Sequence, residues 1–227
     1  MMTRIDQFKE NLGKGEIIFL EKYLSSICEF IKELQSKKLL ANHTKEKIDT
    51  MQKFIRSSNA PQILLNTFYN IIGEVEESDK KIDYLRKAGF DTKLLPEQIG
   101  SIICHSYQVK AERFKLYLVT LINFSKLGKQ NADKESLGPL LTILKREFPK
   151  NKFVNYFTTT IRNPVTHYTY YFEKGDICLC NGYYDARPKK LTLAQFIIES
   201  KELNILVEAF LFIYLDNFAG PGKVVLV

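Results

Sequence analysis

Three residues of one short segment have side chains that could act together on a phosphate group. Arg162, Asn163 and His167 stand in the stretch RNPVTH, and the whole chain has only 3 histidines. A guanidinium binds phosphate oxygens through charge-assisted hydrogen bonds. An imidazole has a pKa of about 6.5, which lets it accept and return a proton near neutral pH. Together these groups could support phosphodiester chemistry.

Their spacing requires a break in the backbone. Residues five apart on a regular helix point about 140° away from each other, so Arg162 and His167 would not share a site on an unbroken helix. Pro164 disfavours helical backbone at Asn163, which predicts that Asn163 caps a new helix with Pro164 in its first turn. His167 would then lie among free N–H groups that attract an anion, with Arg162 beside it.

A second interpretation gives this segment no chemistry. An Asn-Pro pair is a good helix stop. Arg162 would then be an ordinary exposed base, and His167 would be a half-buried strand residue. The residues alone leave both interpretations open.

Other combinations of reactive residues match known sites poorly. Cys178 and Cys180 share one face of a predicted strand, but their C-x-C spacing is too short for structural zinc, and Cys28 and Cys104 supply no second pair. Buried, small apolar side chains are the favoured interpretation of the cysteines. Cys104 and His105 are adjacent and diverge by about 100° on a helix, so a nucleophile–base pair would need tertiary contacts. The sequence contains no P-loop, G-x-G-x-x-G, H-E-x-x-H or G-x-S-x-G motif.

Positive charge is concentrated around the RNPVTH segment. The net charge is +7, and residues 139–190 hold nine bases and four acids, which is +5 of that total. Basic side chains interspersed with aromatic ones suit a phosphate-bearing partner. A solvated, lysine-rich surface would give the same composition.

Hydrophobic periodicity predicts a mainly α protein. Apolar residues recur with the helical period through most of the first half, and Thr192 is placed to cap a last, heavily apolar helix. Between residues 168 and 180, strand-forming residues around a Gly175 turn predict one small β-hairpin. We expect helices over residues 16–38, 44–56, 61–87, 96–127, 139–148, 151–162 and 193–218.

Length and composition exclude several classes of protein. With 227 residues, of which 45% are apolar, the chain can bury a sizeable core. Its 4 cysteines are too few for a disulfide scaffold. The longest uninterrupted apolar run is far too short to span a membrane, and the N-terminus shows no secretory signal. We therefore expect a cytoplasmic protein with no membrane partner.

The RNPVTH segment resembles the signature of the HEPN superfamily, in which an Arg and a polar residue precede a His by a few positions. Arg162, Asn163 and His167 match its R-N-x-x-x-H form, with helices before it and a hairpin and closing helix after it. The resemblance implies an antiparallel helical bundle over residues 96–227, with a small β-hairpin before the last helix. Residues 1–95 would form an extra helical layer packed on this domain, or part of one continuous domain.

The resemblance also implies an activity and partners. HEPN-like proteins include metal-independent endoribonucleases of defence and toxin–antitoxin systems, which commonly form homodimers and can have an antitoxin or regulatory protein partner. His167 would be the general acid or base, Arg162 would stabilise the charged phosphorane, and Asn163 would orient the site. No metal or cofactor is expected. The products would carry 2′,3′-cyclic phosphate and 5′-hydroxyl ends.

The expected partner is RNA, and two further functions stay open. The chain could be a non-catalytic helical module that binds RNA or a nucleotide, or a helical protein-interaction scaffold in which the segment is only a turn. The residues expected to bind RNA are Lys150, Lys152, Tyr168, Tyr170, Arg187, Lys189 and Lys190.

Overall fold

The computed structural model describes most of the second half of the chain and the first helical region. The described residues are 4–40, 96–125, 127, 135–156, 159–182 and 187–218, with the isolated residues 70, 73, 74, 77, 80, 81 and 84. Within them the chain forms seven helices and three strands, so the mainly α prediction is confirmed. None of the helices in these ranges has the length and apolar character needed to cross a membrane.

The chain divides into two compact units, each built from separate stretches of sequence. Unit 1 comprises Met1–Asn66, Phe114–Phe157 and Ile205–Val227, and unit 2 comprises Thr67–Arg113 and Thr158–Asn204. Two long helices contribute to both units: α5, Pro96–Phe124, and α9, Leu193–Phe218. The remaining described helices of unit 1 are α1 (Arg4–Glu10), α2 (Lys14–Ser36), α6 (Leu137–Glu147) and α7 (Lys152–Tyr156).

The core of unit 1 is a cluster of aromatic rings. Phe153 of α7 lies at its centre, with its ring 5.0 Å from Phe30 of α2 and 5.4 Å from Phe210 of α9, centroid to centroid. Phe114 of α5 meets both Phe153 and Phe210 edge to face. Each of these four rings is almost completely buried. Aromatic pairs in such arrangements add to the stability gained from burying their area.

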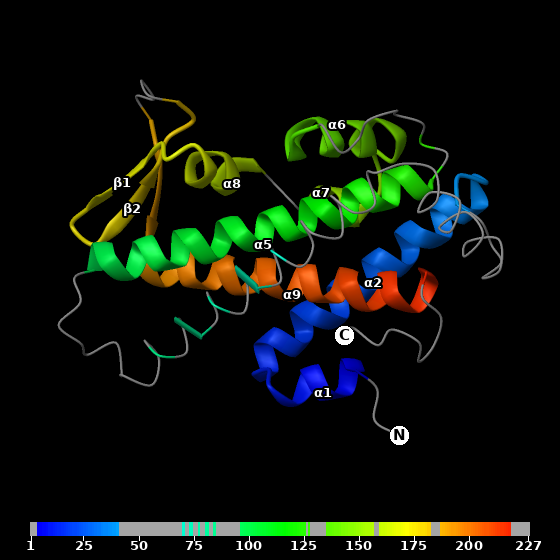
Figure 1. The fold of residues 1–227 in the computed structure, drawn as a ribbon, viewed down its shortest axis with the longest axis horizontal. Coiled ribbons are helices and arrows are strands. Elements are labelled where there is room, and N and C mark those ends of the chain that lie inside the picture. The colour runs from blue at the N-terminus through cyan, green and yellow to red at the C-terminus, as the bar shows by residue number, and fades with distance from the viewer. Residues whose placement is uncertain are drawn as a thin grey trace. The chain divides into compact units, whose positions relative to one another are not determined.

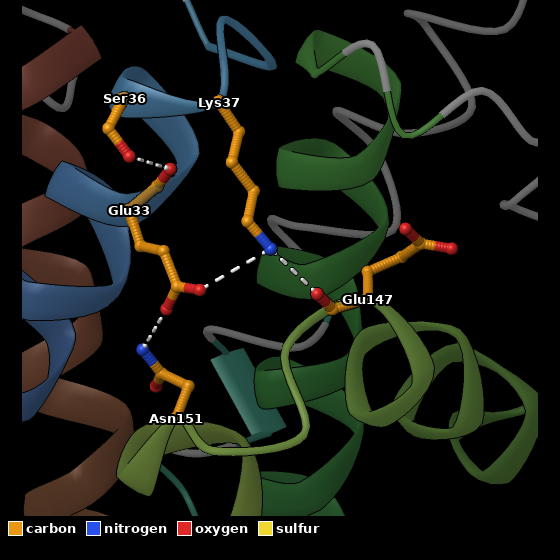
Figure 2. A network of polar contacts seen from close by, with 5 residues as sticks. All are labelled: Glu33, Ser36, Lys37, Glu147 and Asn151. Carbon is orange, nitrogen blue, oxygen red and sulfur yellow. Dashed lines mark hydrogen bonds and ion pairs between the residues drawn. The ribbon is translucent and has the colours of Figure 1, made fainter.

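A polar network joins the ends of three helices in the same unit (Figure 2). Lys37, just after α2, donates a hydrogen bond of 2.9 Å to the backbone carbonyl of Glu147, the last residue of α6. The amide of Asn151 donates to Glu33 of α2 at 2.9 Å, while its oxygen accepts from the N–H of Phe153 at 3.0 Å. Asn151 thereby caps α7 and ties it to α2. The network fixes the short connection that carries Lys150 and the start of α7 at Lys152.

Unit 2 contains a three-stranded antiparallel sheet in the order β1-β2-β3 (Figure 1). Its strands are β1 (Tyr170–Glu173), β2 (Asp176–Leu179) and β3 (Lys189–Thr192), and α8 (Thr159–Thr166) packs against β2. Lys174 and Gly175 both have positive φ between β1 and β2, as a tight hairpin turn requires. Phe172 of β1 lies against Gly100 in the first turns of α5. This contact places the sheet beside the beginning of α5.

Several sequence predictions are confirmed within a few residues. The helices expected over 16–38, 96–127 and 139–148 are α2, α5 and α6. Thr192 caps α9 as predicted: its hydroxyl accepts from the N–H of Gln195, whose side chain accepts from the N–H of Thr192. This reciprocal pair is a capping box. The helix expected over 44–56 lies outside the described residues, as does all but isolated positions of that over 61–87. The division at residue 95 stays a prediction.

Other expectations need correction. The single helix expected over 151–162 is two helices, α7 and α8, and α8 continues to Thr166. The hairpin is present, but β3 extends it to a sheet that sequence reasoning missed. β3 has only four residues, two of them lysines, and only Leu191 is buried. So short and polar a strand lacks the apolar alternation that identifies strands in a sequence.

The contact between Gly100 and Phe172 generates a prediction. A Cβ at residue 100 would fall far inside van der Waals contact with the Phe172 ring, whereas one at Gly138 in α6 would meet nothing within 4 Å. Gly100→Ala should therefore destabilise the protein by about 1–3 kcal/mol through overpacking. Gly138→Ala should leave it unchanged or more stable by up to about 1 kcal/mol. Urea unfolding of both variants checks this, and equal effects at the two glycines would contradict the packing of β1 on α5.

Candidate functional site

The candidate motif lies on α8, which continues through Pro164. Asn163 and Pro164 are both helical, and the N–H of His167 donates to the carbonyl of Asn163 at 2.9 Å, the normal helical pattern. The predicted break at Asn163 is therefore wrong. Proline removes one helical hydrogen bond, but Ile161 and Val165 are almost fully buried on the inner face of α8. Packing of this face outweighs the local preference against helix before proline.

The C-terminal end of α8 is closed by a Schellman motif. Tyr168 has a φ of 56°, in the left-handed region. Its N–H donates to the carbonyl of Val165 at 3.5 Å, and the N–H of Thr169 donates to that of Pro164 at 2.9 Å. These two bonds are those that define the motif, in which the left-handed residue is usually glycine. His167 and Tyr168 are consequently both exposed at the turn that leaves the helix.

Arg162 is buried and paired. Only 7% of its side chain is exposed, and its Nη2 donates to Oε1 of Glu112 on α5 at 2.6 Å. Its Nη1 donates to the Asn163 side-chain oxygen at 3.3 Å, while its buried Nε has no hydrogen-bond partner among the described atoms. A charge taken out of water is tolerated when it is paired in this way. The guanidinium is thus fixed between α8 and α5.

Arg162 and His167 are not brought onto one site within the chain. Because α8 is unbroken between them, the two side chains leave the helix about 140° apart, and one is buried while the other is exposed. No hydrogen bond joins the His167 ring to any described group. His167 also lies at the C-terminal end of α8, where the helix presents backbone carbonyl oxygens, and not among the N–H groups of a first turn. The anion-binding first turn that the sequence predicted is therefore absent from this segment.

The residues expected to bind RNA fall in different environments. Lys150 and Lys152 are exposed in unit 1, and the other five belong to unit 2. Lys190 pairs with Glu173 at 3.0 Å and Asp176 at 3.7 Å, and its hydrogen bond to Glu173 raises its pKa. Neighbouring carboxylates thus offset part of the positive charge.

The remaining members of that set differ from each other in exposure. Lys189 lies 3.7 Å from Glu199, and Arg187 is exposed. Tyr168 is 72% exposed. Tyr170 is half-buried and hydrogen-bonded to the Cys104 thiol of α5, while its neighbour Tyr171 is the β1 tyrosine that faces solvent, at 48% exposure. Strand alternation decides which of the two adjacent tyrosines is available.

The setting of Cys104 disfavours reactivity. Burial raises the pKa of the Cys104 thiol to about 12, and a hydrogen bond from Tyr170 offsets only part of this effect. The thiol therefore stays protonated near neutral pH, which disfavours a nucleophilic role beside His105. Cys178 is buried in β2 and Cys180 is half-buried after it. Among the described residues, no three His, Cys, Asp or Glu side chains are grouped so that they could hold a metal ion.

Glu112 is the site residue that sequence reasoning missed. It lies 50 positions before Arg162, so nothing local links the two residues. A signal was nevertheless present, because three charged residues, Lys110, Glu112 and Arg113, stand close together near the middle of the long helix α5. Both Lys110 and Arg113 are buried, as Arg162 is. Charges in the middle of a long buried helix indicate partners elsewhere in the fold.

The raised pKa of Cys104 generates a prediction about alkaline stability. The folded state favours the protonated thiol, so its contribution is complete below the ordinary pKa of 9.0 and is lost as pH rises towards about 12. Above pH ~9 the free energy of unfolding should fall, by up to about 1.4 kcal/mol per pH unit from this thiol. In Cys104→Ala the unfolding free energy should fall less steeply with pH, by the amount that corresponds to about one proton released on unfolding. Urea unfolding across this pH range checks it, and an unchanged slope would contradict the burial of the thiol.

The ion pair between α8 and α5 can be tested by a double-mutant cycle. Glu112→Ala should be strongly destabilising because it leaves the buried Arg162 guanidinium unpaired. The double variant Glu112→Ala with Arg162→Met should be less destabilised than the sum of the single variants, by about 1–3 kcal/mol. Chemical denaturation of the four proteins gives the coupling energy. Strict additivity would show that the pair does not form.

Comparison with known proteins gives no further assignment. No family model, no curated protein and no solved structure matches the chain. Its function must therefore be argued from its own residues and their geometry.

Proposed function

We propose that this chain is a HEPN-like, metal-independent endoribonuclease in which His167 is the catalytic residue. The observation that carries the proposal is the position of His167: its ring is exposed at the end of α8 and makes no hydrogen bond to the described part of the chain. The polar residues of the motif precede it on the same helix, and Arg162 is anchored by Glu112. An exposed imidazole on a fixed support can exchange protons with a bound substrate. On this proposal the helices form a HEPN-like bundle.

The proposed reaction is an internal transfer of the phosphate within RNA. The imidazole of His167 takes the proton from a ribose 2′-hydroxyl, and the 2′-oxygen forms a bond to the adjacent phosphorus. The bond from phosphorus to the 5′-oxygen of the next nucleotide breaks, and an imidazolium returns a proton to that oxygen. The products are a 2′,3′-cyclic phosphate and a 5′-hydroxyl. In a homodimer, as the HEPN resemblance implies, the second copy of His167 would supply the acid.

Arg162 is best assigned a positioning role. With 7% of its side chain exposed and one of its nitrogens bonded to Glu112, it does not present its guanidinium to a phosphate. Its pairing instead fixes α8 against α5, and thereby fixes the position of His167. The geometry thus favours positioning over direct stabilisation of the phosphorane. Asn163, bonded to the same guanidinium, belongs to that support.

An RNA cleavage assay tests the proposal. The purified protein is incubated with end-labelled single-stranded RNA in the presence of EDTA, together with His167→Ala and His105→Ala. His105 is a matched control because its side chain is also exposed, with its Nε2 3.6 Å from Oε2 of Glu74. Loss of a general acid–base should slow cleavage by about 100-fold or more in His167→Ala, and His105→Ala should cleave normally. Cleavage that persists unchanged in His167→Ala would contradict the assignment.

A second candidate is an RNA-binding module that does not cleave. The observation that favours it is the burial of Arg162 against Glu112, which leaves His167 as the only exposed member of Arg162, Asn163 and His167. This candidate predicts no cleavage by the wild-type chain, and RNA binding that weakens with salt and persists in His167→Ala. Absence of both cleavage and binding would instead favour the protein-interaction scaffold.

A further inference from the structure

Tyr168 occupies a backbone conformation that suits glycine and not tyrosine. Its φ of 56° places it in the left-handed region, at the position of the Schellman motif where glycine is usual. A bulky side chain is rarely found there, because the Cβ crowds the backbone. Such residues persist where the surrounding structure enforces them, and they gather at functional sites.

The backbone on both sides of Tyr168 is held firmly. On the helix side, the carbonyls of Val165 and Pro164 accept the two N–H groups of the Schellman motif. On the sheet side, Thr169 and Cys180 are joined twice: the N–H of Cys180 donates to the carbonyl of Thr169 at 2.8 Å, and the Thr169 hydroxyl donates to the carbonyl of Cys180 at 2.8 Å. Relaxing the backbone at Tyr168 would therefore disturb hydrogen bonds on both sides. Its ring is carried on this hydrogen-bonded corner between α8 and β1.

The ring itself contributes little to packing of the chain. Tyr168 is 72% exposed, so the strained position is not compensated by burial of its side chain. It directly follows His167, which is exposed at the same turn. A flat, exposed aromatic ring on a hydrogen-bonded backbone, next to an exposed imidazole, has the properties of a platform on which a nucleobase stacks.

We propose that Tyr168 is a base-stacking platform that makes the chain select single-stranded over double-stranded RNA. This inference rests on the proposed function, because it names the class of RNA that would reach His167. An unpaired base can leave its neighbours and stack on a protein ring, whereas a base in a duplex is already stacked on both sides. Stacking on Tyr168 holds the nucleotide beside His167 and leaves the choice of base open, since every base has an aromatic face.

A binding experiment in a cleavage-deficient background tests the platform. The full chain carrying His167→Ala is titrated with a short fluorescent single-stranded RNA, and separately with that strand annealed to its complement. Tyr168→Phe and Tyr168→Gly are then added to this background. Tyr84→Gly is the matched control, because Tyr84 is a tyrosine of unit 2 with nearly the same exposure, 71%.

The expected results distinguish loss of the aromatic ring from loss of the folded structure. Tyr168→Gly should weaken binding of the single strand roughly 5- to 100-fold, from the contribution of one stacked base, and leave duplex binding unchanged. Tyr168→Phe should bind normally because it keeps the ring, and so should Tyr84→Gly. Glycine suits the left-handed backbone, so Tyr168→Gly should also melt at the same temperature as its parent or a few degrees higher. Weaker binding therefore would not reflect unfolding.

Other outcomes overturn the platform or the ribonuclease separately. Unchanged single-strand binding by Tyr168→Gly, an equal loss for strand and duplex, or failure of Tyr168→Phe to bind would each overturn the platform. Cleavage by the His167-intact chain that Tyr168→Gly leaves unaffected also overturns the platform, while the ribonuclease stands. Single-strand binding that depends on Tyr168, in a chain that never cleaves, keeps the platform and overturns the ribonuclease. A chain that binds no RNA overturns both.

Discussion

The guanidinium of Arg162 lies out of water against the carboxylate of Glu112, 2.6 Å away, and the arrangement of the candidate motif depends on this pair. A buried positive charge without such a partner would be strongly destabilising. Meeting that constraint holds α8 against α5 with its apolar face inward. Because α8 stays helical past Pro164, the same constraint places His167 on the outer side, away from Arg162. The pair thus separates the motif into a buried anchor and an exposed imidazole.

The end of α8 is as constrained as its middle. The Schellman bonds on one side and the two hydrogen bonds between Thr169 and Cys180 on the other restrain the backbone at Tyr168. From there β1 runs back along α5, with Tyr170 against Cys104 and Phe172 against Gly100. Helix and strand geometry therefore decides which side chains face solvent around this corner. They are His167, Tyr168 and Tyr171. The packing of α8 and β1 on α5 therefore determines the proposed site as much as the sequence motif does.

The sequence predicted the parts of this structure that follow from local pattern. Apolar periodicity located α2 and α5, and Thr192 marked the start of α9. It failed where tertiary contacts decide. A residue before proline prefers non-helical backbone, but burial of the inner face of α8 outweighs this preference at Asn163. The wrongly predicted break at Asn163 also led to the wrongly predicted anion site at His167. Glu112 was missed because 50 residues separate it from its partner, and β3 because a strand of two lysines and one buried leucine carries no apolar alternation.

We propose above that RNA reaches the exposed ring of His167. The most direct measurement is histidine NMR of the full chain titrated with 2′-O-methyl RNA, which lacks the hydroxyl required for cleavage and so remains intact. With 3 histidines in the chain, each ring signal can be assigned by substitution. If RNA binds there, the His167 signal shifts with added RNA while that of His105 stays in place. Saturating RNA that leaves the His167 signal unmoved would contradict the proposal.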